Sequence, residues 1–299
     1  MSGMSLLNTY RFITDAPLNR SRRTSALVRF AKWQVGSRLV PGRVVHDWVN
    51  GSQFLVGQGE RGLTGNIYNG LHEFEDMGFL LHFLRPADLF VDVGANAGSF
   101  TILASSVIGA RTVAFEPIPS TFERLEENVR LNGIDALVTC VNGGVAATGG
   151  RITFTTGDDA MNHVAAPGAE TDTGMSVEVT TLDTALHGED PALIKIDVEG
   201  FELPVLEGAT RTLERPGLRA VIAELNGGGR RYGFDDVRVV ELLRDVGFEP
   251  LSYDPLRRAL SGSDGTAAES KNVLFIRDRE FVEDRVVSAP DVAVLDQSF

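Results

Sequence analysis

Cysteine is nearly absent from this sequence, and long hydrophobic runs are absent. The single cysteine, Cys140, cannot form an intrachain disulfide and cannot by itself supply a thiolate zinc site. No apolar run approaches the roughly 20 residues that a transmembrane helix needs, and no apolar stretch near the first residue precedes a signal-peptide cleavage site. We therefore expect a cytoplasmic protein with no transmembrane segment.

An excess of positive charge is also lacking, because 41 acidic residues outnumber 28 basic ones and give a net charge of −13. A chain of this charge repels a phosphate backbone, so we expect no nucleic-acid partner. Metal-ligand spacing is missing among His46, His72, His82 and His187. The 299 residues suffice for one large domain with extensions or for two small ones.

What the sequence does contain is a glycine-rich turn between a strand and a helix. Residues 89–93 predict a short buried strand, Gly94 and Gly98 bracket the turn, and residues 98–108 predict a helix. This arrangement is typical of sites for nucleotide-like ligands, since glycine allows close approach of the backbone. The N-terminus of the helix adds N–H groups that have no partner inside the helix.

The turn reads Gly-Ala-Asn-Ala-Gly over residues 94–98, with Asp92 two residues before it. It departs from the G-x-G-x-x-G turn of dinucleotide-binding proteins and is similar to the first motif of class I S-adenosylmethionine (SAM) methyltransferases. Residues 112–115 predict the next strand, and Glu116 ends it about twenty residues after the turn, where an acid suits hydrogen bonding to two ribose hydroxyls. Alternatively, Glu116 belongs to the N-terminal region of the next helix.

The first 50 residues are basic, in contrast with the rest of the chain. Their basic residues are Arg11, Arg20, Arg22, Arg23, Arg29, Lys32, Arg38 and Arg43. Residues 25–39 carry apolar side chains at helical spacing and predict an amphipathic helix. One interpretation is that this helix packs on the core or forms an oligomer interface. The other is that its surface attracts an anionic substrate or a membrane.

Glu73 stands near the start of a second predicted helix. Residues 57–70 are rich in glycine and predict a loop, and residues 71–84 predict a helix with Glu73 in its first turn. A carboxylate at this position either complements the helix dipole or faces the cofactor.

The remaining chain alternates strands with helices, which is typical of a parallel sheet covered by helices on both faces. The predicted strands span residues 136–141, 193–197 and 220–224. The predicted helices span residues 203–213 and 237–246. Two pairs of alternating segments predict an antiparallel insertion and a final antiparallel pair. These pairs are residues 151–155 with 176–181, and 249–253 with 272–277.

Polar side chains follow the ends of these strands, where open α/β sheets bind ligands. They are Asp92, Glu116, Asn142, Asp197, Glu199, Glu224 and Asn226. So many carboxylates repel one another unless a cation lies among them. SAM supplies a sulfonium and an ammonium. Mg²⁺ held by Asp197, Glu224 and Asn226 is the less favoured alternative, so we assign no metal ligand.

Lys195 lies within a predicted buried strand, on the same face as Asp197 because side chains alternate along a strand. A buried lysine requires a charged partner. We expect Lys195 to pair with a neighbouring carboxylate, whereas Asp197 and Glu199, where the strand ends, are placed to meet the substrate.

Four motifs together resemble the FkbM family of SAM-dependent methyltransferases. They are D-V-G-A-N-A-G-S-F-T from Asp92, F-E-P from Phe115, L-D from Leu182 and K-I-D-V-E-G-F-E from Lys195. The resemblance implies an α/β, Rossmann-like class I methyltransferase fold. Such a fold has a mostly parallel seven-stranded sheet with an antiparallel edge strand and helices on both faces, here with a β-hairpin insertion and a helical N-terminal extension.

The resemblance also implies a division of the chain and, together with the residue patterns above, a set of site residues. The segments are a helical and loop extension (residues 1–64), a methyltransferase domain (65–278) and a C-terminal tail (279–299). The expected cofactor-binding residues are Glu73, Asp92, Gly94, Asn96, Gly98, Ser99, Phe100, Thr101, Glu116, Pro117, Asn142, Gly143 and Asp197. The catalytic candidates are Asp197, Glu224, Glu199 and His163, one of which removes the acceptor's proton.

The implied activity is methyl transfer from SAM, with S-adenosylhomocysteine as product, to a hydroxyl of a sugar or natural-product small molecule. We expect the acceptor under residues 157–174 and the N-terminal segment, which also offers a homo-oligomer interface. The alternatives are an NAD(P)-dependent oxidoreductase and a non-catalytic SAM-fold interaction module. The missing G-x-G-x-x-G turn argues against the first, and the intact acids Asp92, Glu116 and Asp197 argue against the second.

Overall fold

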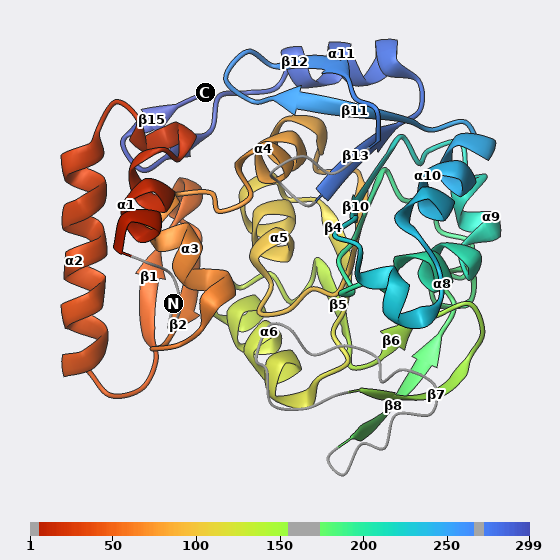
Figure 1. Ribbon diagram of the computed structural model, residues 1–299, viewed down its shortest axis with the longest axis horizontal. Helices are drawn as coiled ribbons and strands as arrows, with labels where there is room; N and C mark the ends of the chain where they lie inside the picture. Colours follow the sequence, from red (N-terminus) through yellow and green to blue (C-terminus); the bar gives the residue numbers. More distant parts are fainter. Residues whose placement is uncertain (1–5, 155–173, 266–271) are drawn as a thin grey trace.

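An eight-stranded sheet forms the centre of the protein, whose computed structural model describes residues 6–154, 174–265 and 272–299 (Figure 1). In spatial order its strands are β5 (Val138–Val141), β4 (Arg111–Phe115), β3 (Leu89–Val93), β9 (Leu193–Ile196), β10 (Ala220–Glu224), β13 (Asn272–Ile276), β11 (Glu249–Asp254) and β12 (Ala259–Gly262). The five strands from β5 to β10 are parallel, whereas β13 is antiparallel to both of its neighbours.

The mostly parallel sheet and its antiparallel edge strand are confirmed, with one strand more than the predicted seven. The edge strand is β12, which pairs with β11, while β13 lies inside the sheet between β10 and β11. The sequence does not predict β12, because among its four residues only Leu260 is buried and the apolar signal is correspondingly weak.

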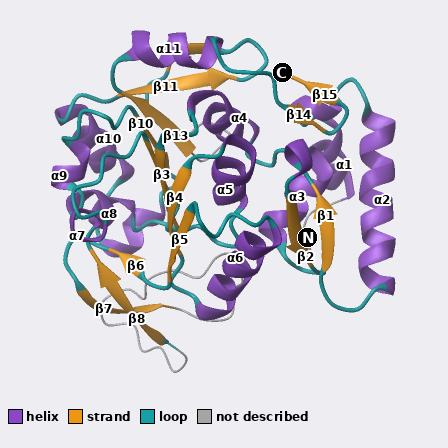
Figure 2. Ribbon diagram, turned by 180° about the vertical axis from the view of Figure 1, so that it is seen from behind, coloured by secondary structure: helices purple, strands orange, loops and turns teal. Residues whose placement is uncertain are grey.

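Helices cover both faces of the sheet (Figure 2). One face carries α4 (Phe74–Phe83), α5 (Ser99–Ile102) with its continuation Leu103–Ile108, and α11 (Arg279–Val287). The other face carries α7 (Leu182–Ala185), α8 (Glu202–Glu207), α9 (Thr210–Leu213) and α10 (Asp236–Asp245), while α6 (Pro119–Leu131) packs on β4 and β5. Neighbouring strand residues point to opposite faces, so Phe90 joins the first core and Val91 the second.

The N-terminal extension packs against the element that follows the glycine turn. It consists of α1 (Leu6–Thr14), α2 (Arg23–Leu39), the hairpin of β1 (Val44–Asp47) and β2 (Gln53–Val56), and α3 (Arg61–Asn69). A helix over residues 25–39 is confirmed as α2, but the single apolar face expected of it is wrong, because Phe30 packs inward whereas Val35 and Leu39 are exposed. Ala97 of the turn and Ile102 of α5 share a hydrophobic core with this extension.

The prediction of a loop over residues 57–70 is wrong for most of its length, because α3 occupies residues 61–69. Leu63, Ile67 and Tyr68 are buried in the N-terminal core and hold the helix in place. Gly65 is required by close packing, since a Cβ there would lie 2.6 Å from the ring of His72. Tertiary packing thus overrides the low helix propensity of glycine.

Residues 279–299, expected to be a tail, pack against the core of the protein. They form α11 and a small hairpin of β14 (Ala293–Val294) and β15 (Gln297–Ser298). Val282 and Val286 of α11 are buried, and Arg285 forms an ion pair with Asp88. Only two apolar side chains of this helix turn inward, so its periodicity is too weak to read from the sequence.

The predicted antiparallel insertion is confirmed, with three strands instead of two. It consists of β6 (Gly144–Val145), β8 (Met175–Thr180) and β7 (Gly150–Phe154), in that spatial order. His163 and most of the predicted acceptor loop lie outside the described residues.

Among the residues that the structure describes, no helix combines the length and the hydropathy needed to cross a membrane.

Gly94 and Gly133 offer a test of the close approach at the turn. Both have left-handed φ angles, but a Cβ on Gly94 would lie 1.9 Å from the carbonyl oxygen of Asp197, whereas Gly133 faces open space. We expect Gly133→Ala to lower the free energy of unfolding by about 1–2 kcal/mol and Gly94→Ala by at least about 2 kcal/mol more. Denaturant unfolding followed by circular dichroism measures both, and equal losses would show that the turn has room for a side chain.

Candidate active site

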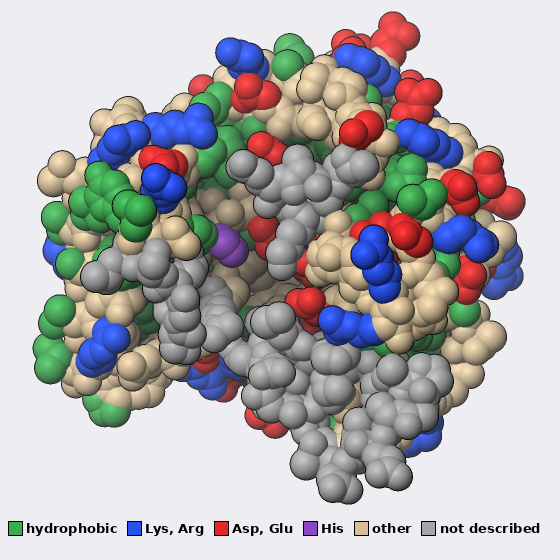
Figure 3. All heavy atoms as spheres, viewed as in Figure 1, with side chains coloured by type: hydrophobic (Ala, Val, Ile, Leu, Met, Phe, Trp, Pro, Cys, Tyr) green, Lys and Arg blue, Asp and Glu red, His purple; other side chains and the backbone are tan. Residues whose placement is uncertain are grey.

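A cavity of about 1110 Å³ opens at the carboxyl ends of β3, β4, β9 and β10, and acidic side chains gather around it (Figure 3). Phe12 and Pro17 of the N-terminal extension line its opposite wall. The predicted site residues that line it are Glu73, Asp92, Gly94, Asn96, Ser99, Phe100, Glu116, Pro117, Gly143, Asp197, Glu199 and Glu224. Gly98, Thr101 and Asn142 are not part of the lining.

The glycine turn is fixed by hydrogen bonds to the neighbouring strand. The N–H groups of Gly94 and Ala95 donate to the carbonyl of Phe115 at 3.0 and 2.9 Å. Asn96 has a φ of 51°, which is uncommon outside glycine, and its side chain accepts from the N–H of Ala97 at 2.7 Å. The chain itself therefore sets the shape that the turn presents to the cavity.

Glu116 presents a buried carboxylate at the end of β4. Its two oxygens accept from the backbone N–H of Asn96 at 3.0 Å and of Ile118 at 2.9 Å, and the residue is only 6% exposed. Burial raises the pKa of Glu116 to about 7, although these two donors oppose the shift. The carboxylate is thus fixed in position and joins the glycine turn to β4.

Thr101 and Asn142, two of the expected cofactor-binding residues, do not line the cavity but hydrogen-bond to residues that do. The hydroxyl of Thr101 donates to Asp92 at 2.7 Å. The side chain of Asn142 donates to the carbonyl of Glu116 at 2.9 Å. Burial raises the pKa of Asp92 to about 6, a shift that Lys195 and Thr101 oppose.

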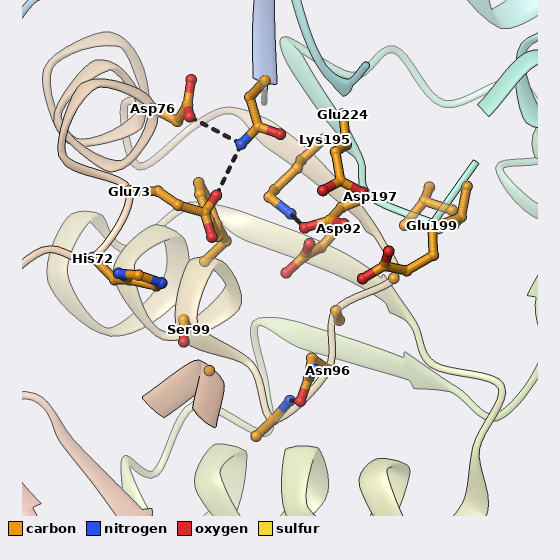
Figure 4. A pocket seen from close by; sticks show the side chains of 18 of the residues that line it. His72, Glu73, Asp76, Asp92, Asn96, Ser99, Lys195, Asp197, Glu199 and Glu224 are labelled. Atoms are coloured by element: carbon orange, nitrogen blue, oxygen red, sulfur yellow. Dashed lines mark hydrogen bonds and ion pairs between the residues drawn. The ribbon is translucent and has the colours of Figure 1, made fainter. Parts of the chain in front are cut away.

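Lys195 is the buried cation among these acids, and its predicted pairing with a carboxylate is confirmed. Its ammonium lies 2.6 Å from Asp197 and 4.6 Å from the ring centroid of Phe100 (Figure 4). Burial alone would lower the pKa of Lys195, but the charges of Asp197, Glu73 and Asp92 outweigh burial and raise the pKa above its usual value. Lys195 therefore remains charged at physiological pH.

Asn272 is a residue of the site that sequence reasoning missed. Its amide nitrogen donates to Glu73 and to Asp76, each at 2.9 Å, and so ties the start of β13 to α4 (Figure 4). Burial, followed by the charge of Glu73, raises the pKa of Asp76 to about 7. The spacing of Glu73 and Asp76 was an available signal, whereas nothing local indicated their shared partner, which lies 199 and 196 residues further along the chain.

Three further carboxylates converge at the ends of β9 and β10. Asp197, Glu199 and Glu224 each offer an oxygen, and these oxygens lie within 4.8 Å of one another. Asp197 and Glu224 end adjacent strands. Glu199 has a φ of 53°, so the chain turns sharply there. Such a group can exchange a proton with a ligand or hold a hard divalent cation.

The strand order and the cavity at the end of β3 define the class I methyltransferase fold. A sequence model of the methyltransferase FkbM domain matches residues 92–250, which is more than half of the chain. The chain belongs to the FkbM methyltransferase family, and the resemblance noted in its motifs is confirmed.

Several known proteins are similar to this chain. Hexuronic acid methyltransferase AglP of Haloferax volcanii is 32% identical over 152 residues, covering 50% of this chain and 60% of AglP. The 31-O-demethyl-FK506 methyltransferase FkbM of Streptomyces tacrolimicus is 31% identical over 222 residues, covering 61% of this chain and 82% of that protein. A solved FkbM methyltransferase from Methylobacillus flagellatus KT has 16% identity and a TM-score of 0.46, covering 71% of this chain and 52% of that one.

The buried ion pair predicts a large cost for removing its cation. Lys195→Met leaves Asp197 and Asp92 without their counter-charge and should lower the free energy of unfolding by about 3–5 kcal/mol. Arg151→Met is the matched control, because the ion pair of Arg151 with Glu178 is exposed and should be worth at most about 1 kcal/mol. Adding Asp197→Asn to Lys195→Met should recover part of the loss in denaturant unfolding. Strictly additive losses would contradict the pairing.

Proposed function

We propose that this protein is a SAM-dependent O-methyltransferase that acts on a hydroxyl of a sugar or natural-product small molecule. The observation that carries the proposal is that one cavity contains two sets of groups. The glycine turn with Glu116 suits a nucleoside, and the carboxylates of Asp197, Glu199 and Glu224 suit a proton-transfer step.

The residues present fit SAM. The fixed carboxylate of Glu116 is placed to accept from ribose hydroxyls, and Ile118, Gly143 and Phe154 line the cavity nearby and suit the adenine base. The acids along β3, β9 and β10 outnumber their one buried cation, Lys195, so a ligand that carries a sulfonium and an ammonium relieves their repulsion. When bound, SAM supplies a methyl group activated by the positive sulfur.

The chain contributes alignment and proton removal. A hydroxyl held between the two sets of groups loses its proton to a carboxylate as its oxygen gains the methyl group. We assign that role to Asp197 or Glu224, which end adjacent strands and face the same cavity. The other carboxylate, together with Glu199, orients the acceptor. His163 is the reserve candidate if both carboxylates prove dispensable.

The acceptor class rests on the family and on its named relatives. One relative is named for a hexuronic acid and the other for 31-O-demethyl-FK506. The wall formed by Phe12 and Pro17 lies outside the family match and is therefore the part of the cavity suited to select the acceptor. A screen of sugars and polyketide alcohols with labelled SAM tests this assignment. Methylated nitrogen in protein or nucleic acid, with no O-methyl product, would overturn it.

Calorimetric titration with S-adenosylhomocysteine tests the cofactor site. Glu116→Gln removes the charged acceptor and should weaken binding by about 1.5–3 kcal/mol. Glu126→Gln is the matched control, because Glu126 is a half-exposed acid on α6 outside the cavity lining, and this variant should bind like the unaltered protein. NAD in place of S-adenosylhomocysteine should give no heat. Binding of NAD would favour the oxidoreductase alternative, and unchanged affinity of Glu116→Gln would remove Glu116 from the site.

The same titration should depend on pH. Because the pKa of Glu116 is raised to about 7, the group is protonated below that value and ribose hydroxyls then lose their charged acceptor. Affinity should therefore rise about tenfold from about pH 6 to about pH 8 and level off above. The dependence should be smaller in Glu116→Gln, in which Asp76 and Asp92 are the cavity acids with raised pKa values that remain.

Single-turnover kinetics on an acceptor found in the screen tests the base. Asp197→Asn and Glu224→Gln should each be measured with and without EDTA, and loss of the base should slow methyl transfer by about 10²–10⁴-fold while S-adenosylhomocysteine still binds. Wild-type rates in both variants would move the role to His163. Loss of activity in EDTA that Mg²⁺ restores would show that Asp197, Glu199 and Glu224 bind a metal ion. Any methyl transfer in this assay would also rule out the alternative that the protein is a non-catalytic interaction module.

A further inference from the structure

Helix α2 is apolar on two opposite faces. Its inner face packs Ala26, Phe30 and Trp33 into the N-terminal core. Its outer face exposes Val28, Val35 and Leu39, which are 46%, 59% and 75% exposed. A helix that is apolar on both sides is typical of a position covered on both sides, so the outer face is expected to have an occupant.

The exposed residues form one continuous stripe. Positions 28, 35 and 39 follow a spacing of seven and four residues, which places them on the same side of the helix with Ala31 and Lys32 between them. The stripe extends about 16 Å along the helix axis. Both ribbon views place α2 at the outer edge of the molecule, away from the central sheet (Figures 1 and 2). We call residues 28, 31, 32, 35 and 39 the α2 stripe.

The charges around the α2 stripe are positive. The first 50 residues contain eight basic and two acidic side chains, a net charge of +6, whereas the whole chain has −13. Within α2 there are four basic residues and no acid. Among the described residues, no carboxylate forms an ion pair with Arg11, Lys32 or Arg38, all of which are exposed. Figure 3 shows hydrophobic and basic side chains together on this edge.

We propose that the α2 stripe docks on an anionic lipid surface. Exposed valine and leucine side chains enter the boundary between headgroups and acyl chains, while lysine and arginine bind the anionic headgroups. A second copy of this chain fits less well. Lys32 lies in the middle of the stripe, so a two-fold contact would place it against the Lys32 of the other copy, with no acid on either helix to compensate.

Sedimentation of the full-length protein with lipid vesicles tests the proposal. The protein should sediment with phosphatidylcholine vesicles that contain phosphatidylglycerol, should stay in the supernatant with phosphatidylcholine alone, and should be released by salt. Lys32→Glu reverses one charge at the surface and should weaken vesicle binding roughly 30-fold. Val35→Glu should abolish it.

Helix α10 supplies matched controls on a different part of the molecule. Val237 is 57% exposed, close to the 59% of Val35, and Arg244 is an exposed basic residue like Lys32. Val237→Glu and Arg244→Glu should bind vesicles like the unaltered protein, and all four variants should keep their circular dichroism and their affinity for S-adenosylhomocysteine.

Failure to bind phosphatidylglycerol vesicles would overturn the proposal, as would equal binding by Val35→Glu and Val237→Glu. A dimer in light scattering that Val35→Glu converts to monomer, without any vesicle binding, would assign the α2 stripe to a second copy instead.

Discussion

The buried charge of Lys195 is the interaction on which the acidic cavity depends. Lys195 and Asp92 are direct partners across the parallel pair β9 and β3, in the middle of the sheet. Asp197 lies at 2.6 Å and Glu73 reaches the same charge from α4. Carboxylates from two strands and a helix can share one cavity because this ammonium offsets part of their repulsion. The register of two neighbouring strands thus sets the charge balance of the site.

Backbone contacts between loops supply a second constraint. The turn after β3 passes so close to the end of β9 that only glycine fits at position 94. A similar contact brings Gly200 against Gly228, where a Cβ would lie 2.4 Å from the backbone. These contacts hold the loops after β3, β9 and β10 against one another. The positions of Asp197, Glu199 and Glu224 therefore depend on glycines that take no part in the chemistry themselves.

The cavity is not confined to the segment that matches the family. The match spans residues 92–250, yet Phe12 and Pro17, Glu73 and Asp76, and Asn272 all line the cavity. Residues within the match supply the glycine turn, Glu116 and the carboxylates after β9 and β10. The wall formed by Phe12 and Pro17 belongs to the same N-terminal extension that carries the α2 stripe.

The sequence by itself determined the parts of the protein that local patterns encode. The glycine turn after Asp92, the acid at position 116 and the strand with Lys195 and Asp197 could be read because turn composition and two-residue alternation act over a few neighbours. Those patterns also predicted the parallel sheet, which the structure confirms.

Only the tertiary structure decided which side chains face the cavity and which support it. Asn272 joins α4 from 196 residues away from Asp76, Thr101 and Asn142 turn to Asp92 and Glu116, and α3 forms despite its glycines. No local pattern encodes these outcomes, because the free energy of each depends on burial and on hydrogen-bond partners that only the folded chain brings together.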